Sequence, residues 1–289
     1  MKICFLNRLR SSHPGGDMIA MDATIAALKR RGVDAFFMED FRDTLPEADA
    51  YHVMHCNFGW SEEMVAKVIG NPLVITPVFY PDESIGLTFG QIGTMLRWAD
   101  VVLPFSYAEL GEITWHCGMI PFKVIPNGTD PKFHLGNGYE YAKRKRGCEV
   151  ITVHARKGDK NTDFVKSICE ELNVDCYIAN GISEIDMPDS YGASRVFINC
   201  STSERMSLST GEALCAGCRV IDTTENRGNE WYPGIVQVCP WSKEAVKGTL
   251  EYALTCPTWD FRPNDAARIL TWDFVADELI QVYRKVAAA

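Results

Sequence analysis

The feature that most constrains the fold is an alternation of short apolar strands with helices, which starts twice along the chain. In the first run, a strand over residues 2–7 leads through a loop into a helix ending near residue 31, and a second strand spans residues 33–38. The second run opens with a strand over residues 149–154 and a helix over residues 162–172. Alternation of this kind is typical of parallel sheets with helices on their faces. The sequence therefore predicts an α/β fold with two Rossmann-like domains.

The boundary between the two runs lies near the middle of the chain. The turn sequence PNGTD at residues 126–130 follows a predicted strand, and residues 131–147 combine glycines with the basic run KRKR. Such a segment is typical of a linker, and we interpret the basic run as a solvated face. We expect an N-terminal domain over residues 1–130, a C-terminal domain over 148–271, and a helix over 272–286 with apolar residues at helical spacing.

Charge and cysteine content narrow the class of protein. The chain has 29 Lys and Arg and 38 Asp and Glu, which gives a net charge of −9. This charge argues against binding to nucleic acid or an anionic membrane through an extensive basic surface. No apolar run approaches the roughly 20 residues that cross a bilayer. The eleven cysteines, without an N-terminal leader before the first strand, indicate a reducing compartment. We expect a cytoplasmic protein.

The candidate functional residues are concentrated in the stretch STSERMSLSTGEALCAGCRVI, residues 201–221. It follows a predicted strand over residues 196–200 and contains a helix whose N-cap candidates are Ser207, Ser209 and Thr210. A helix N-terminus at the carboxyl end of a strand is an anion site that suits phosphate. Glu204 and Glu212 flank it, and each can accept hydroxyl groups such as sugars present. Phosphate donors between two such carboxylates describe a nucleotide-sugar site; an ordinary loop with a capping and a surface Glu is the alternative.

The same stretch resembles the signature of the retaining GT-B glycosyltransferases of group 1, the superfamily of glycogen synthase and many mannosyltransferases. The matching residues are Glu204, Ser207-Leu208-Ser209, Glu212-Ala213-Leu214, Gly217 and Val220-Ile221. This chain would be a compact member. The resemblance implies the GT-B fold, in which two Rossmann-like domains face a cleft, and a last helix that packs back on the N-terminal domain.

Further parts of the chain match the family in order. Gly15-Gly16 stands where the family has a glycine pair after its first strand. Arg156 and Lys160 match an Arg and a Lys that the family directs at the donor diphosphate; two solvated basic residues are the alternative. His55 lies where the family often has a His. The place of another family His is taken by residues 78–80, and this departure leaves the sugar contacts on that side open.

The resemblance implies transfer of a sugar from a UDP- or GDP-linked donor with retention of configuration. The implied catalytic residues are Arg156, Lys160 and Glu204, and the implied donor-binding residues are Gly15, Gly16, Ser207, Leu208, Ser209 and Glu212. With no Asp-x-Asp motif between strands, we expect a metal-independent enzyme, without a cofactor beyond the nucleotide-sugar. The acceptor is open between a glycan, a lipid, a small molecule and DNA.

Other functions remain as alternatives. Arg8, Arg10 and the basic run keep open a glycosyltransferase of viral type that modifies DNA bases. A non-catalytic nucleotide-binding protein of the same fold is a second alternative, because the segment that would form the base pocket is short. An NAD-dependent enzyme is less well supported, since Gly15-Gly16 lacks the full dinucleotide fingerprint. Cys215 and Cys218 form a CxxC, but at the end of a helix, whereas redox pairs usually open one.

Overall fold

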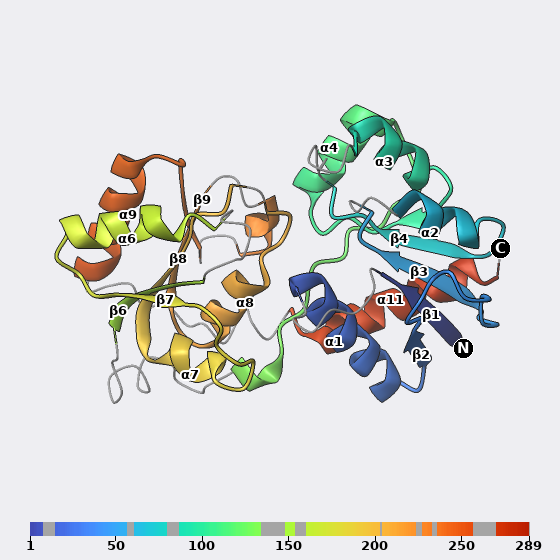
Figure 1. Cartoon of the computed structure of the whole chain (residues 1–289), viewed down its shortest axis with the longest axis horizontal. Coiled ribbons are helices and arrows are strands. Elements are labelled where there is room, and N and C mark those ends of the chain that lie inside the picture. Colours follow the sequence, from blue (N-terminus) through green and yellow to red (C-terminus); the bar gives the residue numbers. More distant parts are fainter. Residues whose placement is uncertain are drawn as a thin grey trace. The chain divides into compact units, whose positions relative to one another are not determined.

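The computed structural model describes residues 1–7, 15–56, 61–79, 87–133, 148–153, 160–202, 204–223, 227–232, 236–256 and 270–288. The chain divides into two compact units. The first consists of Met1–Gly128 and Trp272–Ala289, and the second of Thr129–Thr271 (Figure 1).

The first unit is built on a five-stranded parallel sheet with the order β2-β1-β3-β4-β5. Its strands are β1 (Lys2–Leu6), β2 (Asp34–Phe37), β3 (Ala50–Met54), β4 (Leu73–Thr76) and β5 (Val101–Val102). Its helices are α1 (Gly16–Arg30), α2 (Ser61–Val68), α3 (Phe89–Leu96), α4 (Tyr107–Cys117) and α11 (Trp272–Val286). Every residue of β3 and β4 is buried, as expected for central parallel strands covered on both faces.

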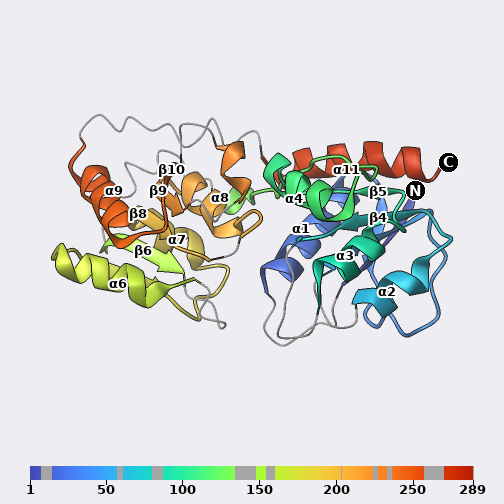
Figure 2. The ribbon, with the colours of Figure 1, turned by 90° about the horizontal axis from the view of Figure 1, so that it is seen from above.

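The last helix, α11, packs against α1 in the first unit, and Figure 2 shows the two helices. Its buried residues recur at helical spacing, so one apolar stripe faces inward. At the solvent edge, Arg30 Nη2 lies 2.7 Å from Asp273 Oδ1, and Arg31 Nε lies 2.7 Å from Asp277 Oδ1. Apolar burial therefore holds α11, and the exposed ion pairs add little beyond orientation.

The second unit has another five-stranded parallel sheet, with the order β10-β9-β8-β6-β7. Its strands are β6 (Cys148–Val153), β7 (Cys176–Ala179), β8 (Ser194–Asn199), β9 (Arg219–Thr223) and β10 (Gln237–Cys239). Its α-helices are α6 (Thr162–Glu171), α7 (Met187–Gly192), α8 (Leu208–Cys215) and α9 (Lys243–Thr255). Short 3₁₀ helices span Pro131–Phe133 and Arg227–Trp231.

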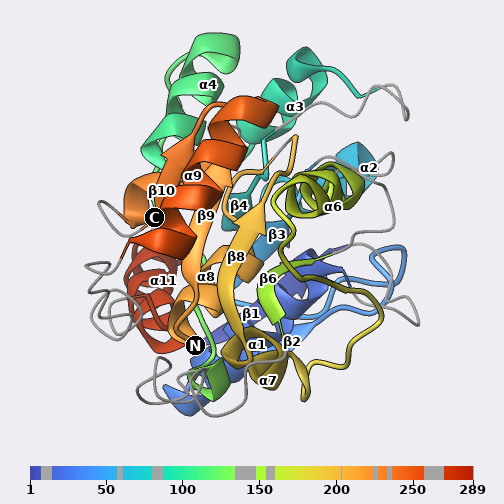
Figure 3. The same ribbon diagram turned by 90° about the vertical axis from the view of Figure 1, so that its left-hand side faces the viewer.

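Two pairs of helices cover this second sheet. Residues of α6 and α9 share one apolar cluster with β6, β8 and β9, and Figure 3 shows the two helices in front of these strands. The helices α7 and α8 contact one another and lie on the opposite side of the sheet in Figure 1. The sheet is thus covered on both faces, and the residues directly after β8 lie at its carboxyl edge.

The α/β class and the two Rossmann-like sheets predicted from the sequence are confirmed. One predicted strand is wrong: residues 122–125 form no strand, and only a single bridge joins Phe122 to Val102. The sequence interpretation omitted α3 and β10. The sequence also predicts a helix over residues 265–270, of which 265–269 lie outside the described residues.

Candidate functional site

Two of the predicted catalytic residues meet at the carboxyl edge of the second sheet. Lys160 precedes α6, and Glu204 lies in the loop between β8 and α8. The Nζ of Lys160 donates a hydrogen bond to Oε1 of Glu204, and the two side chains are 17% and 19% exposed. The structure therefore places a cation and an anion side by side at the edge where parallel sheets bind ligands.

The start of α6 is tied to the end of β8, which explains why Lys160 reaches Glu204. Asn161 has a left-handed backbone with φ of 49°, a conformation that Asn tolerates better than most residues. Its Nδ2 donates to the carbonyl oxygen of Cys200 at 2.8 Å. Trp241 Nε1 donates to the same oxygen at 3.2 Å. These bonds fix the end of β8 against the helix that begins after Lys160.

A buried chain of polar side chains, which the sequence interpretation missed, lies behind Glu204. Ser201 Oγ is 2.7 Å from Asn199 Oδ1 and 3.2 Å from Glu204 Oε1. Asn199 Nδ2 donates to Asp222 Oδ2 at 3.4 Å, and Thr210 Oγ1 donates to the same oxygen at 2.9 Å. Asp222 is fully buried. The chain connects the Glu204 loop to α8, so the two parts of the site are held together by hydrogen bonds within one unit.

The predicted phosphate-binding segment forms the N-terminus of α8. Ser207 is the N-cap, with extended backbone angles of φ −70° and ψ 123°, and its side chain makes no capping bond to the helix. Instead, Ser207 Oγ pairs with Ser209 Oγ at 2.8 Å. Leu208 is the first residue of the helix. Because the Ser207 side chain does not cap the helix, backbone N–H groups at the N-terminus of α8 can bind an anion. The helix dipole also favours negative charge there.

Glu212 lies one turn into α8 in a different environment. It is partly buried, and Tyr191 Oη donates to its Oε2 at 3.3 Å. Burial raises the pKa of Glu212 to about 7, although the nearby Lys132 lowers it. Lys132 Nζ itself lies 3.4 Å from Glu184 Oε2. Glu212 is therefore a carboxyl group whose charge changes near neutral pH.

The remaining predicted site residues lie elsewhere. Gly15 is the N-cap of α1 in the first unit, and its carbonyl accepts from Met18 N at 3.0 Å; Gly16 is the first residue of that helix. Arg156 lies outside the described residues.

The CxxC pair is buried within the second unit. Cys215 and Cys218 are 1% and 0% exposed, and Cys218 Sγ donates to the carbonyl oxygen of Tyr191 at 3.1 Å. Burial raises the pKa of Cys215 to about 12. A redox pair needs an accessible thiolate, so this environment favours a structural role.

In the first unit, a buried carboxylate organises the loops after β4 and β5. Glu109 in α4 is fully buried; its Oε1 accepts from Phe79 N at 2.6 Å and its Oε2 from Phe105 N at 2.7 Å. His55, directly after β3, has a positive φ of 70°, and Val78, in the loop after β4, has a positive φ of 49°. Strain of this kind is costly for a β-branched residue and persists where the surroundings hold it.

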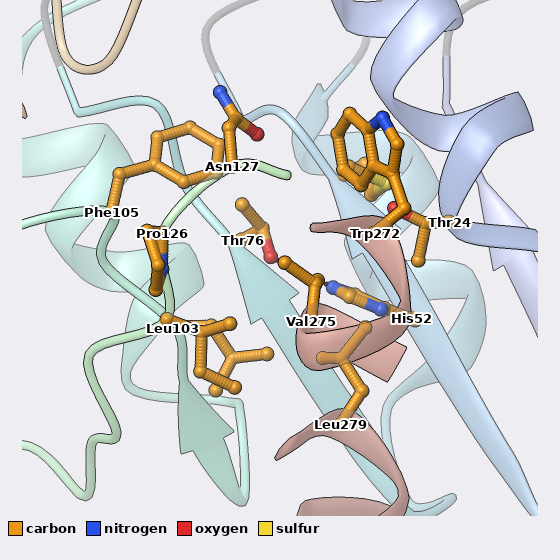
Figure 4. A pocket seen from close by; sticks show the side chains of 12 residues that line it. Thr24, His52, Thr76, Leu103, Phe105, Pro126, Asn127, Trp272, Val275 and Leu279 are labelled. Atoms are coloured by element: carbon orange, nitrogen blue, oxygen red, sulfur yellow. Dashed lines mark hydrogen bonds between the residues drawn. The ribbon is translucent and has the colours of Figure 1, made fainter. Parts of the chain in front are cut away.

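Figure 4 shows a small cavity in the first unit, with Trp272, Val275 and Leu279 of α11 in its wall. Its volume is about 20 Å³, which is space for one water molecule. His52 also lines it: its Nδ1 is 2.7 Å from Tyr283 Oη and its Nε2 2.8 Å from Thr76 Oγ1. This cavity is too small for a nucleotide or a sugar.

Among the described residues, no group of three His, Cys, Asp or Glu side chains is placed to hold a metal ion. The described helices include none that is long and apolar enough to cross a membrane.

The fold defined by these two units is the GT-B fold of glycosyltransferases. A sucrose-phosphate synthase from Thermosynechococcus elongatus matches with a TM-score of 0.78 at 14% identity, covering 100% of both chains. HepE from Anabaena, solved in complex with UDP and glucose, matches with a TM-score of 0.73 at 12% identity over 99% of this chain and 100% of its own. A glycosyltransferase from Rickettsia africae matches with a TM-score of 0.68 at 13% identity over 99% and 98%.

No protein-family model matches the sequence, and no curated protein sequence matches it either. At identities this low, the structural likeness establishes the fold alone.

Proposed function

We propose that the protein is a glycosyltransferase that moves a sugar from a nucleotide-sugar to an acceptor, with retention of configuration and without a metal ion. The observation that carries this proposal is the meeting of Lys160 and Glu204 at the carboxyl edge of the second sheet, beside the loop that leads into α8. A nucleotide-sugar presents the complementary chemistry, a diphosphate next to a ring of hydroxyl groups.

Each group of the site has a distinct role in this proposal. Lys160 and the N-terminus of α8, from Ser207 to Ser209, bind the diphosphate and stabilise its charge as the sugar leaves. Arg156 is proposed to assist them. Glu204 accepts hydrogen bonds from the sugar, and Glu212 accepts them from the ribose of the nucleotide.

The reaction then needs little covalent chemistry from the protein. The glycosidic carbon–oxygen bond to the diphosphate breaks, the acceptor oxygen bonds to the same carbon, and the acceptor proton goes to the leaving diphosphate. The protein positions the donor and stabilises the developing charge. Gly15 and Gly16, at the N-terminus of α1 in the first unit, are proposed to bind the donor, because glycine leaves the backbone accessible.

The nucleotide is proposed to be UDP or GDP, and UDP is the first to test because HepE was solved with UDP and glucose. A nucleotide-sugar is then a substrate, and the proposal includes no further cofactor.

The test is slow hydrolysis of a panel of UDP- and GDP-sugars, which needs no acceptor. The wild type should release the nucleoside diphosphate from one of them. Lys160→Ala should release it about 10²–10³-fold more slowly. Lys243→Ala, which removes an exposed lysine paired with Glu171 in the same unit, should behave like wild type. Proton NMR of the released sugar gives its anomeric configuration.

A thermal-shift panel with UDP, GDP and NAD provides an independent measurement. Stabilisation by UDP or GDP supports the proposal. Stabilisation by NAD alone, together with no hydrolysis of any nucleotide-sugar, would overturn it.

A further inference from the structure

Lys160 and Glu204 bind one another in the structure, although the proposed function gives each of them a different ligand. Lys160 Nζ donates to Glu204 Oε1, and both side chains are more than four-fifths buried. A diphosphate that binds Lys160 must therefore replace or share a carboxylate that is already there. In taking a diphosphate as the ligand of Lys160, this inference rests on the proposed function.

Removing Lys160 from Glu204 has a cost that depends on what else the carboxylate can bind. A partly desolvated carboxylate needs hydrogen-bond donors to stay ionised. Ser201 is within reach, because its Oγ is 3.2 Å from Glu204 Oε1. Its hydroxyl has one hydrogen, however, and Asn199 Oδ1 lies closer, at 2.7 Å. Among the described side chains, Ser201 therefore compensates only in part, and a donor from the ligand would stabilise Glu204 further.

We propose that Glu204 and the ligand's phosphate compete for Lys160, so that the site selects a ligand carrying both a diphosphate and neighbouring hydroxyl groups. The phosphate becomes the partner of Lys160, and the hydroxyl groups become the partners of Glu204. An intact nucleotide-sugar satisfies both residues. A free nucleoside diphosphate satisfies Lys160 and, within the part of the chain that the structure describes, leaves Glu204 with Ser201 as its side-chain donor.

This competition has a consequence for turnover. After transfer, the sugar leaves with the acceptor, and Glu204 loses the hydroxyl groups that it bound. The Lys160–Glu204 pair then re-forms and weakens the hold on the nucleoside diphosphate. The same pair that selects the donor therefore promotes release of the product.

The test is a double-mutant cycle on binding of inorganic pyrophosphate, measured by isothermal titration calorimetry without any turnover. The four proteins are wild type, Glu204→Gln, Lys160→Met and the double variant. Removing the competing carboxylate should tighten pyrophosphate binding by about three- to tenfold, the scale of one partly exposed ion pair. In the Lys160→Met background, the same Glu204→Gln change should have an effect of less than about twofold.

Two further variants exclude simpler explanations. Glu171→Gln removes a carboxylate paired with Lys243 elsewhere in the same unit, and it should leave pyrophosphate binding unchanged. Glu204→Ala repeats the measurement with a side chain that cannot bond to Lys160 at all. Each variant is first compared with wild type in thermal unfolding, so that only folded proteins enter the cycle.

The outcomes separate this inference from the proposed function. Equal tightening with and without Lys160 would show general charge repulsion and overturn the competition. Weaker or unchanged binding in both Glu204→Gln and Glu204→Ala, or no pyrophosphate binding by any of the folded proteins, would overturn it as well. A coupled cycle in a protein that hydrolyses no nucleotide-sugar would leave the competition standing and count against the glycosyltransferase.

Discussion

The buried His52 predicts a specific loss of stability in acid. His52 is 1% exposed, and burial lowers its pKa to about 3. In the unfolded chain the pKa of a histidine is about 6.5. Between these values the unfolded state holds one proton more than the folded state, so stability falls as pH falls through this window. The contribution of neutral His52 is present above about pH 6.5 and is lost towards pH 3.

The size of the effect follows from the shift. Each pH unit within the window changes the free energy of unfolding by about 1.4 kcal/mol, so the loss from about pH 6.5 to pH 5 is about 2 kcal/mol. In His52→Gln this dependence should disappear. Tyr283→Phe and Thr76→Val each remove one hydrogen-bond partner of His52 and should lower stability by about 1–3 kcal/mol. Because they retain the buried His52, they should keep the pH dependence.

The assay must report the first unit by itself, because a chain of two units need not unfold in one step. Cys4 and Cys56 are buried thiols of this unit, and they become accessible to a labelling reagent when it opens. Labelling in a urea series at pH 7, 6 and 5 gives the free energy of unfolding of wild type and each variant. A wild-type minus His52→Gln difference that stays flat from pH 7 to 5 would refute the reasoning.

Three further predictions concern the second unit. Lys160→Ala should lower kcat for nucleotide-sugar hydrolysis by about 10²–10³, the scale of one lost electrostatic stabiliser. An unchanged kcat would show that Lys160 takes no part in the reaction. Glu212→Ala should chiefly raise the KM for donor. Because the pKa of Glu212 is raised to about 7, the wild-type KM should also rise as pH falls below 7, whereas a KM that is flat with pH would exclude an ionised Glu212 as ligand. Gly211→Ala places a Cβ 2.9 Å from both Thr129 Oγ1 and Tyr232 Oη. The free energy of unfolding of the second unit in urea should therefore fall by about 1–2 kcal/mol, despite the better helix propensity of Ala. Equal or greater stability of the variant would contradict this packing.

Much of the fold follows from local patterns. The strands β1 and β2 lie within the predicted ranges 2–7 and 33–38, because each is a short apolar run next to turn residues. The helix α3 was missed, since its two glycines disfavour a helix on propensity alone. It forms because Thr88 and Gln91 make a capping box, and because Gly93 lets Cys117 approach so closely that a Cβ would lie 2.7 Å from Sγ. Neither reason can be read from propensity.

The site could be predicted in part for similar reasons. Glu204 and Glu212 are candidates from their places around a predicted helix N-terminus, and Lys160 is one from the family resemblance. The contact between Lys160 and Glu204 depends on β6 lying beside β8, which follows from the order of strands in space and not from the order in sequence. Asp222 carries no signal of its own, because a single Asp at the end of a strand is ordinary. Its importance emerges only from the buried bonds that reach it from Asn199 and Thr210.

The position of α11 has a consequence for how the protein is made. The first unit contains the start of the chain and also Trp272–Ala289, whereas the second unit is continuous from Thr129 to Thr271. At a synthesis rate of about 5–20 residues per second, α11 is therefore made on the order of ten seconds after the strands of the first sheet. All residues of the second unit are synthesised before the last residues of the first unit. On the ribosome, we therefore expect the second unit to complete its sheet before α11 packs on the first unit.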